Sequence, residues 1–583
     1  MEKSFTRKLL NLFILLFFIS SSFNAQEVLR EISLEEQINA SNLVVEGKVL
    51  SKESFWNSNY TKIFTVNTVE VYKVFKGDLV ETVEVITPGG FVNGKMQKVI
   101  PSLQLNTNDI GLFTLHGEEK SVKSDKIKAF KPYSSVQGFY KYNLIDNVAI
   151  NPFSVIKNIE EDFYARIEKI SNSKFSKVKD FKVVKNTLKN NGIKGVLAPN
   201  ITSFSPTSIT AGTQSQLTIT GTGFGATQGA GSVSFRNADD GGGTFVTALN
   251  GQIISWSDTA IVLEVPSLAG TGTILVTDDS NSSVESVNLL TVTYALSNGQ
   301  ANDTEYKLQH VDMNGDGGIT WIFNSDFESN TNANTAFNAV LKNWSCETGI
   351  NWDVDSNTTT VDSALDDGLN VVSFNVLPAG NLGVTTLYGG ACNNSEDWVV
   401  NQVDLIFDNT DLSPWFYDGG TNLGYDFYSV ALHELGHAHL LNHVVDSDDV
   451  MDYDIALEQQ NRTLNSKNID AANMVQARST ANMICSLPLM SAYAGSCPLS
   501  VEDEELNNSV SMYPNPTIGQ FFIKNDSFLT LEKAVIYDVS GRLISNTDLL
   551  KTKVISLQGV SKGMYFVNIH SSNGMITKKI LKE

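Results

Sequence analysis

The feature that most constrains the fold of this chain is a cluster of histidines. The sequence holds seven histidines, and four of them lie within residues 433–443, which read HELGHAHLLNH. His433 and His437 are four residues apart, so a helix places both on one face, where they can bind one metal ion. His443 can join them only if the helix ends after His437 and the chain turns back. The cluster therefore predicts a helix followed by a sharp reversal.

The residue types in the cluster indicate a zinc site with hydrolytic chemistry. Catalytic zinc takes three protein ligands and keeps one position open, and His433, His437 and His443 supply three imidazoles. Glu434 follows the first ligand, where a carboxylate can hold and deprotonate a metal-bound water. Zinc lowers the pKa of that water toward about 7, so hydroxide forms at neutral pH. His439 is two residues from His437 and about 200° away on a helix, so we expect it to be a packing or surface residue and not a ligand.

The segment continues to Met451 and Tyr453, within DVMDY. This pattern resembles the metzincin-type, matrixin-like zinc metallopeptidases, in which an HExxHxxGxxH helix precedes a Met-turn. The resemblance implies that Zn²⁺ is the cofactor and that Glu434 is the general base. It also implies the metal ligands His433, His437 and His443, and the Met-turn residue Met451. Tyr453 stands at a spacing where a tyrosine can approach the metal or the oxyanion.

One position departs from the family pattern, because Leu440 stands where the family has glycine. A non-glycine residue in a left-handed conformation costs roughly 1–2 kcal/mol, which a bound metal can offset. Alternatively, Asn442 takes the reversal, since asparagine tolerates left-handed angles. A thermolysin-like zincin would instead use a later glutamate as third ligand, and Glu458 is the near candidate, but no second ExxxD pattern accompanies it.

The rest of residues 300–498 fits a metzincin-like α+β catalytic domain. Residues 318–325 are expected to form a strand, residues 331–355 an amphipathic helix running into a strand, and residues 403–409 a further strand. This order resembles the upper half of matrixin-type metzincins. The strand at residues 383–390 is then the expected edge that pairs with a peptide substrate.

The remaining segments predict a multidomain chain in which all-β, immunoglobulin-like sandwich modules flank that domain. Residues 26–150 alternate apolar and polar positions, as a β-rich domain does. In residues 151–198, Ile159, Phe163, Ile167 and Ile170 recur at helical spacing and lead into a linker. Residues 199–295, with SFSPTS, GTGFG and WSDTAIVLEV, resemble the IPT/TIG immunoglobulin-like domains. That resemblance implies a spacer or binding module.

The two ends of the chain indicate export. Residues 1–25 have a basic start, a short apolar run and small polar residues, the form of a secretory signal peptide. Residues 499–510 are an acidic linker. Residues 511–583, with YPNP, YDVSGRLI and GMYFV, resemble the C-terminal sorting domain of the type IX secretion system. The expected partners are thus that machinery and a protein or peptide substrate, and the expected location is secreted or at the cell surface.

Charge and hydropathy exclude two other classes. The formal charge of -22 argues against nucleic acid as the main partner, because phosphate binding needs a basic face. No segment after the leader is apolar enough to span a bilayer, so the mature form is expected to have no transmembrane segment.

A polar loop and four cysteines complete the list of candidate sites. Asp312, Asn314 and Asp316 alternate as at the start of an EF-hand, but the twelfth position is Phe323, so either a polar turn or a partial Ca²⁺ site is expected. Cys346, Cys392, Cys485 and Cys497 allow three pairings, of which we favour Cys346–Cys392 with Cys485–Cys497. No cysteine precedes residue 346, so a cysteine-switch latency is excluded. Another inhibitory role for residues 27–198 stays open.

The sequence thus favours a secreted zinc endopeptidase that hydrolyses peptide bonds with Glu434 as general base. The alternative is a surface adhesin or carbohydrate-binding protein with a catalytically inactive metal site. Glu434 discriminates between them, because a decayed site does not need it and a structural zinc is closed by a fourth protein ligand.

Overall fold

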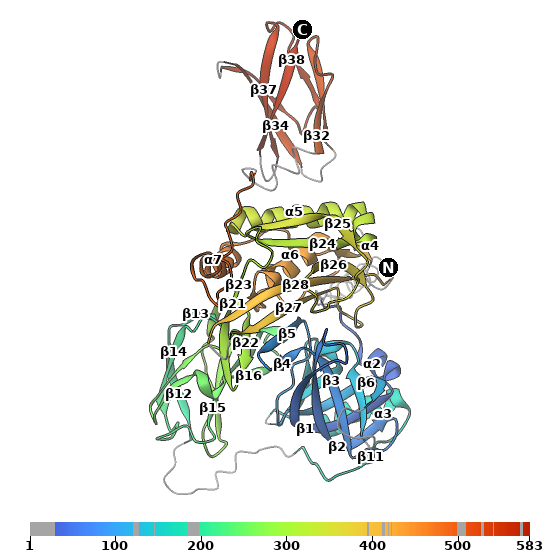
Figure 1. The fold of residues 1–583 in the computed structure, drawn as a ribbon, viewed down its shortest axis with the longest axis vertical. Helices are drawn as coiled ribbons and strands as arrows, with labels where there is room; N and C mark the ends of the chain where they lie inside the picture. Colours follow the sequence, from blue (N-terminus) through green and yellow to red (C-terminus); the bar gives the residue numbers. More distant parts are fainter. Residues whose placement is uncertain are drawn as a thin grey trace, which may run out of the picture.

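The computed structural model describes residues 29–120, 127–144, 146–183, 198–392, 396–410, 414–417, 419–420, 423–497, 509–525, 530–539, 542–571 and 575–583. The expected signal peptide lies outside these residues, as does most of the expected linker at 499–510. Figure 1 shows a central body with an N-terminal and a second body beside it and a C-terminal body beyond. No helix in the described ranges is long and apolar enough to cross a membrane.

The N-terminal body (residues 29–183) is built on a closed sheet. Strand β1 pairs with both β2 and β6, so β1, β2, β3, β7 and β6 form a ring. Its helices and strands are α2 (Leu34–Ala40), β1 (Leu43–Trp56), β2 (Ile63–Lys76), β3 (Thr82–Pro88), β6 (Ile110–Lys120), β7 (Lys128–Pro132), β8 (Phe139–Asn143), β9 (Val148–Asn151), β10 (Ser154–Lys157), α3 (Tyr164–Ser171) and β11 (Ser176–Lys177). The helically spaced Ile159, Phe163 and Ile167 are buried against this sheet.

The second body (residues 198–296) consists of strands only, apart from short helical turns. Its strands are β12 (Asn200–Ser205), β13 (Ser208–Ala211), β14 (Gln216–Thr222), β15 (Ser232–Asn237), β16 (Phe245–Thr247), β17 (Ile253–Trp256), β18 (Ala260–Glu264), β19 (Ala269–Thr277), β20 (Ser283–Glu285) and β21 (Thr291–Leu296). They form the sheets β12-β14-β18-β17 and β16-β15-β19-β20, while β13 pairs with β21. Alternate apolar residues of these strands fill one buried cluster.

The central body (residues 297–497) contains a mixed sheet. Its strands are β22 (Asn298–Ala301), β23 (Thr304–His310), β24 (Ile319–Asn324), β25 (Trp352–Thr359), β26 (Asn370–Asn375), β27 (Gly383–Ala391), β28 (Trp398–Asp408), β29 (Trp415–Phe416), β30 (Tyr425–Asp426) and β31 (Leu441–Asn442). The order β25-β24-β26-β28 is parallel, and β27 runs antiparallel to β28. The strands expected at 318–325, 383–390 and 403–409 correspond to β24, β27 and β28.

Helices pack on this sheet and position the histidine segment. They are α4 (Ser325–Ser329), α5 (Thr331–Thr348), α6 (Phe427–Ala438) and α7 (Ser466–Ala481). The expected apolar stripe of α5 is buried, including Phe337 and Trp344. The indole Nε1 of Trp344 donates a 3.0 Å hydrogen bond to the Leu432 carbonyl of α6, which locks the two helices together. The histidine-bearing helix therefore lies inside the largest buried cluster.

Two strand pairings join the central body to its neighbours. From the N-terminal body, β5 (Lys95–Ile100) pairs with β27, and β4 (Gly90–Val92) pairs with β5. From the second body, β21 pairs with β31, a two-residue strand that begins three residues after the end of α6. The sheet of the central body is thus completed by a segment that lies nearly 300 residues earlier in the chain.

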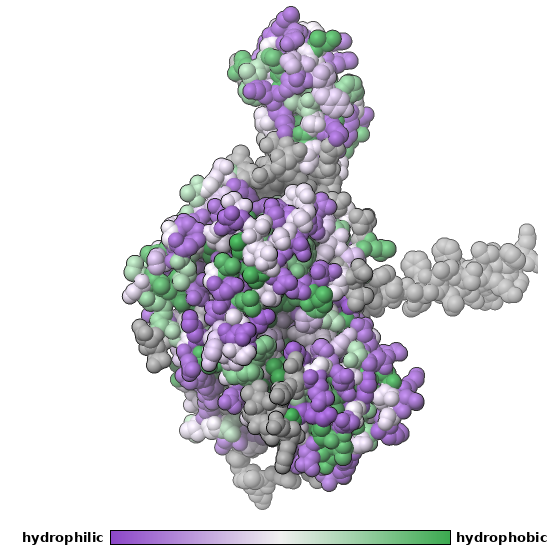
Figure 2. All heavy atoms as spheres, turned by 45° about the vertical axis from the view of Figure 1, so that its right-hand side comes forward, coloured by the Kyte–Doolittle hydropathy of each residue, from purple (hydrophilic) through white to green (hydrophobic). Residues whose placement is uncertain are grey.

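The C-terminal body (residues 509–583) has two sheets, β32-β33-β36 and β35-β34-β37-β38, whose apolar residues share one cluster. Its strands are β32 (Val510–Tyr513), β33 (Gln520–Asn525), β34 (Leu531–Asp538), β35 (Leu543–Asp548), β36 (Val554–Ser556), β37 (Gly563–Ser571) and β38 (Met575–Lys582). Hydrophilic side chains cover most of the face in Figure 2, and hydrophobic ones lie in small groups.

The disulfides in the structure differ from the pairing of cysteines that we favoured from the sequence. The structure joins Cys346 to Cys497 and Cys392 to Cys485, with Cα–Cα distances of 5.5 and 5.4 Å. Our preference for Cys346–Cys392 was wrong, because pairing follows distance in the fold and these distances suit disulfides. One bridge ties α5 to the end of the central body, and the other ties the end of β27 to the segment after α7.

The start of α6 depends on a buried ion pair. Asp426 is fully buried, caps the helix at the Ser429 amide and accepts two hydrogen bonds from Arg462. Asp426→Ala should lower the free energy of unfolding by about 3–5 kcal/mol, because it breaks the ion pair with Arg462, whose side chain is 16% exposed, and removes the cap of α6. Denaturant unfolding measures this.

The matched control is Asp446→Ala, which removes the exposed pair with Lys467. It should cost no more than about 1 kcal/mol. Equal effects of the two substitutions would contradict the role given to Asp426.

Candidate metal centre

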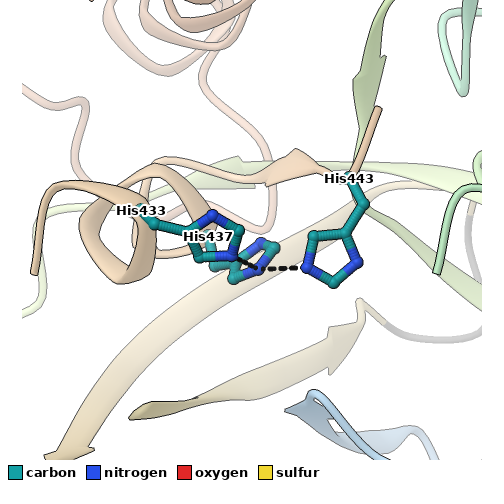
Figure 3. A group of neighbouring side chains, drawn as sticks. All are labelled: His433, His437 and His443. Atoms are coloured by element: carbon teal, nitrogen blue, oxygen red, sulfur yellow. Dashed lines mark hydrogen bonds between the residues drawn. The ribbon is translucent and has the colours of Figure 1, made fainter. Parts of the chain in front are cut away.

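The three predicted histidine ligands meet at one point. His433 and His437 lie one turn apart on α6, and His443 comes from the chain after β31 (Figure 3). The Nε2 atoms of His433 and His437 are 2.9 Å apart, and those of His437 and His443 are 3.1 Å apart. All three side chains are buried. Among the described residues, they are the one group of His, Cys, Asp or Glu arranged to hold a metal ion.

The hydrogen bonds of the other ring nitrogens show which atoms face the centre. The Nδ1 atoms of His433 and His437 lie 2.7 and 2.9 Å from the carbonyl oxygens of Val450 and Leu441. The Nδ1 of His443 lies 2.7 Å from Asp239 Oδ1. Each acceptor requires a proton on Nδ1, so in the neutral form of each ring the lone pair lies on Nε2. Three lone pairs then face one another, which only a cation between them can stabilise.

The spacing of these atoms suits zinc. Tetrahedral ligand nitrogens at 2.0–2.1 Å from zinc lie about 3.3 Å apart, close to the separations observed here. Burial, together with His443, lowers the pKa of His433 to about 3, and burial lowers the pKa of His437 well below its usual value. Both rings are therefore neutral at neutral pH, the form that binds metal.

Leu440 makes the reversal that brings His443 back. Its φ is 66°, so it takes the left-handed conformation for which the family pattern has glycine. Asn442 does not take the left-handed conformation. Its side-chain amide donates a 2.8 Å hydrogen bond to the Ser267 carbonyl of the second body. The Leu440 side chain is fully buried in the main cluster, so its packing compensates for the backbone strain.

Met451 lies against the histidine helix. A Cβ added to Gly436 would be 2.3 Å from the Met451 Sδ, so glycine is required for this close approach. The Met451 amide donates to Asp449 Oδ1, and its carbonyl accepts from the Val444 amide, one residue after His443. Met451 thus lies against the histidine helix, and its role as the Met-turn residue stays a prediction.

Glu434 projects from α6 against strand β27. It is fully buried, and the Thr385 hydroxyl donates a 2.5 Å hydrogen bond to its Oε2. A Cβ on Gly383 would be 2.5 Å from its Oε1, and within the described residues this oxygen accepts no hydrogen bond. Burial raises the pKa of Glu434 to about 8. The side chain is thus held at Oε2 by Thr385, while Oε1 is left without a hydrogen bond among the described residues.

Two other residues of the segment lie differently. The Nε2 of His439 is 3.1 Å from the Thr348 hydroxyl, and its ring packs between Trp344 and Trp352, so it packs in the core as expected. The Tyr453 hydroxyl donates a 3.4 Å hydrogen bond to the Pro152 carbonyl of the N-terminal body. Its approach to the metal or the oxyanion stays a prediction.

The loop at Asp312 gives no support for calcium. The two carboxylate oxygens of Asp312 accept hydrogen bonds from the backbone amides of Gly315 and Gly317. The carboxylate of Asp316 accepts a hydrogen bond from the backbone amide of Gly318. The carboxylates, together with Asn314, thus fold the loop on itself, as expected of a polar turn. The metal-ligand grouping found in the described residues does not include them.

Sequence reasoning missed two residues of the site, Asp239 and Thr385. Asp239 is 204 residues from His443 in the chain and belongs to a helical turn of the second body, Ala238–Asp240. Thr385 is 49 residues from Glu434. Both contacts arise from the packing of distant segments, and no local pattern in the sequence indicates either.

Comparison with known families supports the three resemblances. Residues 317–476 match the matrixin model, residues 199–294 the IPT/TIG domain, and residues 511–583 the secretion system C-terminal sorting domain. The matrixin-like, TIG and type IX sorting resemblances are confirmed. The chain is a multidomain, strand-rich protein with a matrixin segment that spans the metal centre, and its sorting segment indicates export. No curated protein matches the chain.

Similarity to solved structures is weak. An auxiliary nutrient binding protein from Bacteroides thetaiotaomicron is 19% identical over 22% of this chain, with a TM-score of 0.14, and the match spans 31% of that protein. The BSP domain of a biofilm associated protein is 11% identical, covering 93% of this chain and 81% of its own, with a TM-score of 0.15. Similarities at this level carry no information about function.

The left-handed turn at Leu440 predicts which of two substitutions lowers the stability of the chain more. Leu440→Gly removes about 1–2 kcal/mol of strain but loses a buried side chain worth about 2–5 kcal/mol, so it should destabilise the chain by about 0–4 kcal/mol. Leu440→Ala keeps the backbone strain, so its free energy of unfolding should be about 1 kcal/mol lower than that of Leu440→Gly. Denaturant unfolding measures both, and a glycine variant less stable than the alanine variant would contradict the left-handed assignment.

Asp239 should strengthen metal binding through His443. Asp239→Ala removes the acceptor that orients the imidazole, and such outer contacts change metal affinity about 10–100-fold. Competition with a chromophoric chelator measures the zinc dissociation constant. The control is Asp279→Ala, which removes an exposed hydrogen bond in the same body. Zinc affinity that falls equally in both variants would contradict a specific role for Asp239.

Proposed function

We propose that this chain is a secreted zinc endopeptidase. The observation that carries the proposal is the convergence of three buried imidazole Nε2 atoms, together with the buried Glu434 that follows the first of these histidines on the same helix. The matrixin match to residues 317–476 and the sorting-domain match to residues 511–583 support it.

The ligand set favours a catalytic rather than a structural zinc. Structural sites are closed by four protein ligands, whereas the described residues bring three together here. His433, His437 and His443 would hold the ion, and their Nδ1 hydrogen bonds fix each ring so that its Nε2 faces inward. Bound zinc supplies an activated water at neutral pH and polarises the scissile carbonyl.

Glu434 is the residue that we assign to proton transfer. Thr385 holds its Oε2, so the carboxylate is positioned while Oε1 is available to take a proton from the attacking water. The same group can then return the proton to the leaving amine, as a general base that becomes a general acid. Positioned proton transfer of this kind contributes about 10²–10⁴-fold to a rate.

The substrate class follows from the strand beside Glu434. β27 contacts the base through Thr385 and Gly383, so a segment that pairs with β27 passes next to it. Extended polypeptide binds in this way, with main-chain hydrogen bonds that do not depend on sequence. The proposed substrates are therefore proteins or peptides outside the cell.

The adhesin alternative has less support. It would fit the strand-rich bodies on either side of the centre, but it gives no reason for a buried glutamate beside an open set of three ligands. Burial of a carboxylate is costly, so its presence indicates a use.

Glu434→Gln should abolish peptide hydrolysis and keep the metal. We expect the rate of casein cleavage by the zinc-loaded full chain to fall at least about 100-fold, because an amide cannot accept the proton. Bound zinc, measured by atomic absorption, should stay at the parent level. The control is Glu458→Gln, at the exposed glutamate that a thermolysin-like site would use as ligand.

Two results would contradict this assignment. Equal cleavage by the parent and Glu434→Gln would exclude Glu434 as the base. Loss of zinc from Glu458→Gln, with zinc kept in a His443→Ala variant, would replace His443 by Glu458 as the third ligand.

A further inference from the structure

The strand beside Glu434 is already paired in this structure. β27 would be the edge of the central sheet, but β5 of the N-terminal body runs antiparallel along it. The register pairs Thr385 with Ile100 at one end and Gly390 with Lys95 at the other. Thr385 is also the residue that donates to Glu434. β5 thus occupies the position that an extended peptide would take next to the base.

Side chains of β5 pack as parts of the central body. Met96 and Ile100 are 5% and 7% exposed and belong to the same buried cluster as the histidine helix. Phe91 of the neighbouring β4 stacks on Trp398 with ring centroids 4.9 Å apart. Lys98 donates to the Ser297 hydroxyl at 2.7 Å, where the second body meets the central one. The strand is seated by shape and by specific hydrogen bonds.

The N-terminal body also contacts the segment before β27 and the segment after Met451. Before β27, the Ser134 hydroxyl donates to the Ala379 carbonyl at 2.6 Å, and the Arg30 amide donates to Gly380 at 2.5 Å. After the Met-turn, the Pro152 carbonyl accepts from Tyr453. In the whole chain, His433, His437 and His443 are 2%, 0% and 4% exposed. β5 lies along the edge of β27 that an extended substrate would need for main-chain pairing.

We propose that β5 is a built-in occupant of the peptide-binding edge, and that the N-terminal body keeps the enzyme latent until β5 is displaced. The inference rests on the proposed function, since latency has meaning only for a peptidase. It also answers how a chain with no cysteine before residue 346 can be held inactive, because main-chain pairing with β27 needs no thiol on the metal. Partner chains that add a strand to an edge use the same interaction.

The test is to release β5 within the full zinc-loaded chain. Met96→Asp with Ile100→Asp places two carboxylates in an apolar cluster, which disfavours the docked strand. Lys98→Ala is the milder variant, and it removes the bonds to Ser297 and Asn298. Leu79→Asp, at an exposed position of the same body, is the control. Thermal unfolding shows whether each variant is folded. If the double variant Met96→Asp with Ile100→Asp is not folded, the result for Lys98→Ala decides the test.

Two measurements report whether β5 occupies the edge of β27, and neither requires hydrolysis of a substrate. Amide hydrogen exchange of residues 385–390 should be slow in the parent and at least 10-fold faster in the released variants. A fluorescein-labelled tripeptide hydroxamate should bind the released variants at least 10-fold more tightly than the parent or Leu79→Asp. Equal binding to parent and folded variants, or fast exchange in the parent, would overturn the proposal.

Casein cleavage, scored separately, tells the two proposals apart. A rise in cleavage together with probe binding supports both. Tighter probe binding without any cleavage contradicts the peptidase and leaves the occupied edge in place. Cleavage at the same rate by the parent and the released variants overturns latency and leaves the peptidase in place.

Discussion

The structure depends on three imidazole Nε2 atoms that converge at one point. The Nε2 of His437 lies 2.9 Å from that of His433 and 3.1 Å from that of His443, and their lone pairs repel unless a cation separates them. Each imidazole is held by a different segment: His433 by the Val450 carbonyl, His437 by the turn at Leu441, and His443 by Asp239 of the second body. These three hydrogen bonds fix the tautomers and aim every Nε2 inward. The histidine helix, the left-handed turn and the Met-turn are the elements that make this arrangement possible.

This constraint joins bodies that the sequence presents as separate domains. The second body supplies Asp239, accepts the Asn442 side chain and pairs β21 with β31, so it helps to position the third ligand. The N-terminal body adds β5 to the sheet that carries Thr385. Neither module acts as a simple spacer toward the centre. The C-terminal body has its own buried cluster, in keeping with its match to a sorting domain.

Sequence reasoning located the three candidate ligands because their signal is local. The spacing of His433 and His437 reports one helical face, and the departure at Leu440 pointed to the residue that takes the left-handed angle. The strands at β24, β27 and β28 were also predictable from short apolar runs. Asp239, Thr385, the pairing of β5 and the disulfides were not, because each joins segments that are distant in the chain. The favoured pairing Cys346–Cys392 failed for this reason, since chain proximity does not determine distance in the fold.

The most direct test of the account is zinc X-ray absorption spectroscopy on the purified full chain at neutral pH. The account predicts one zinc per chain with three imidazole nitrogens at about 2.0–2.1 Å and one further oxygen from water. A fourth protein ligand in place of the water would show a closed structural site. A chain that binds no zinc at all would remove the basis of the proposed function.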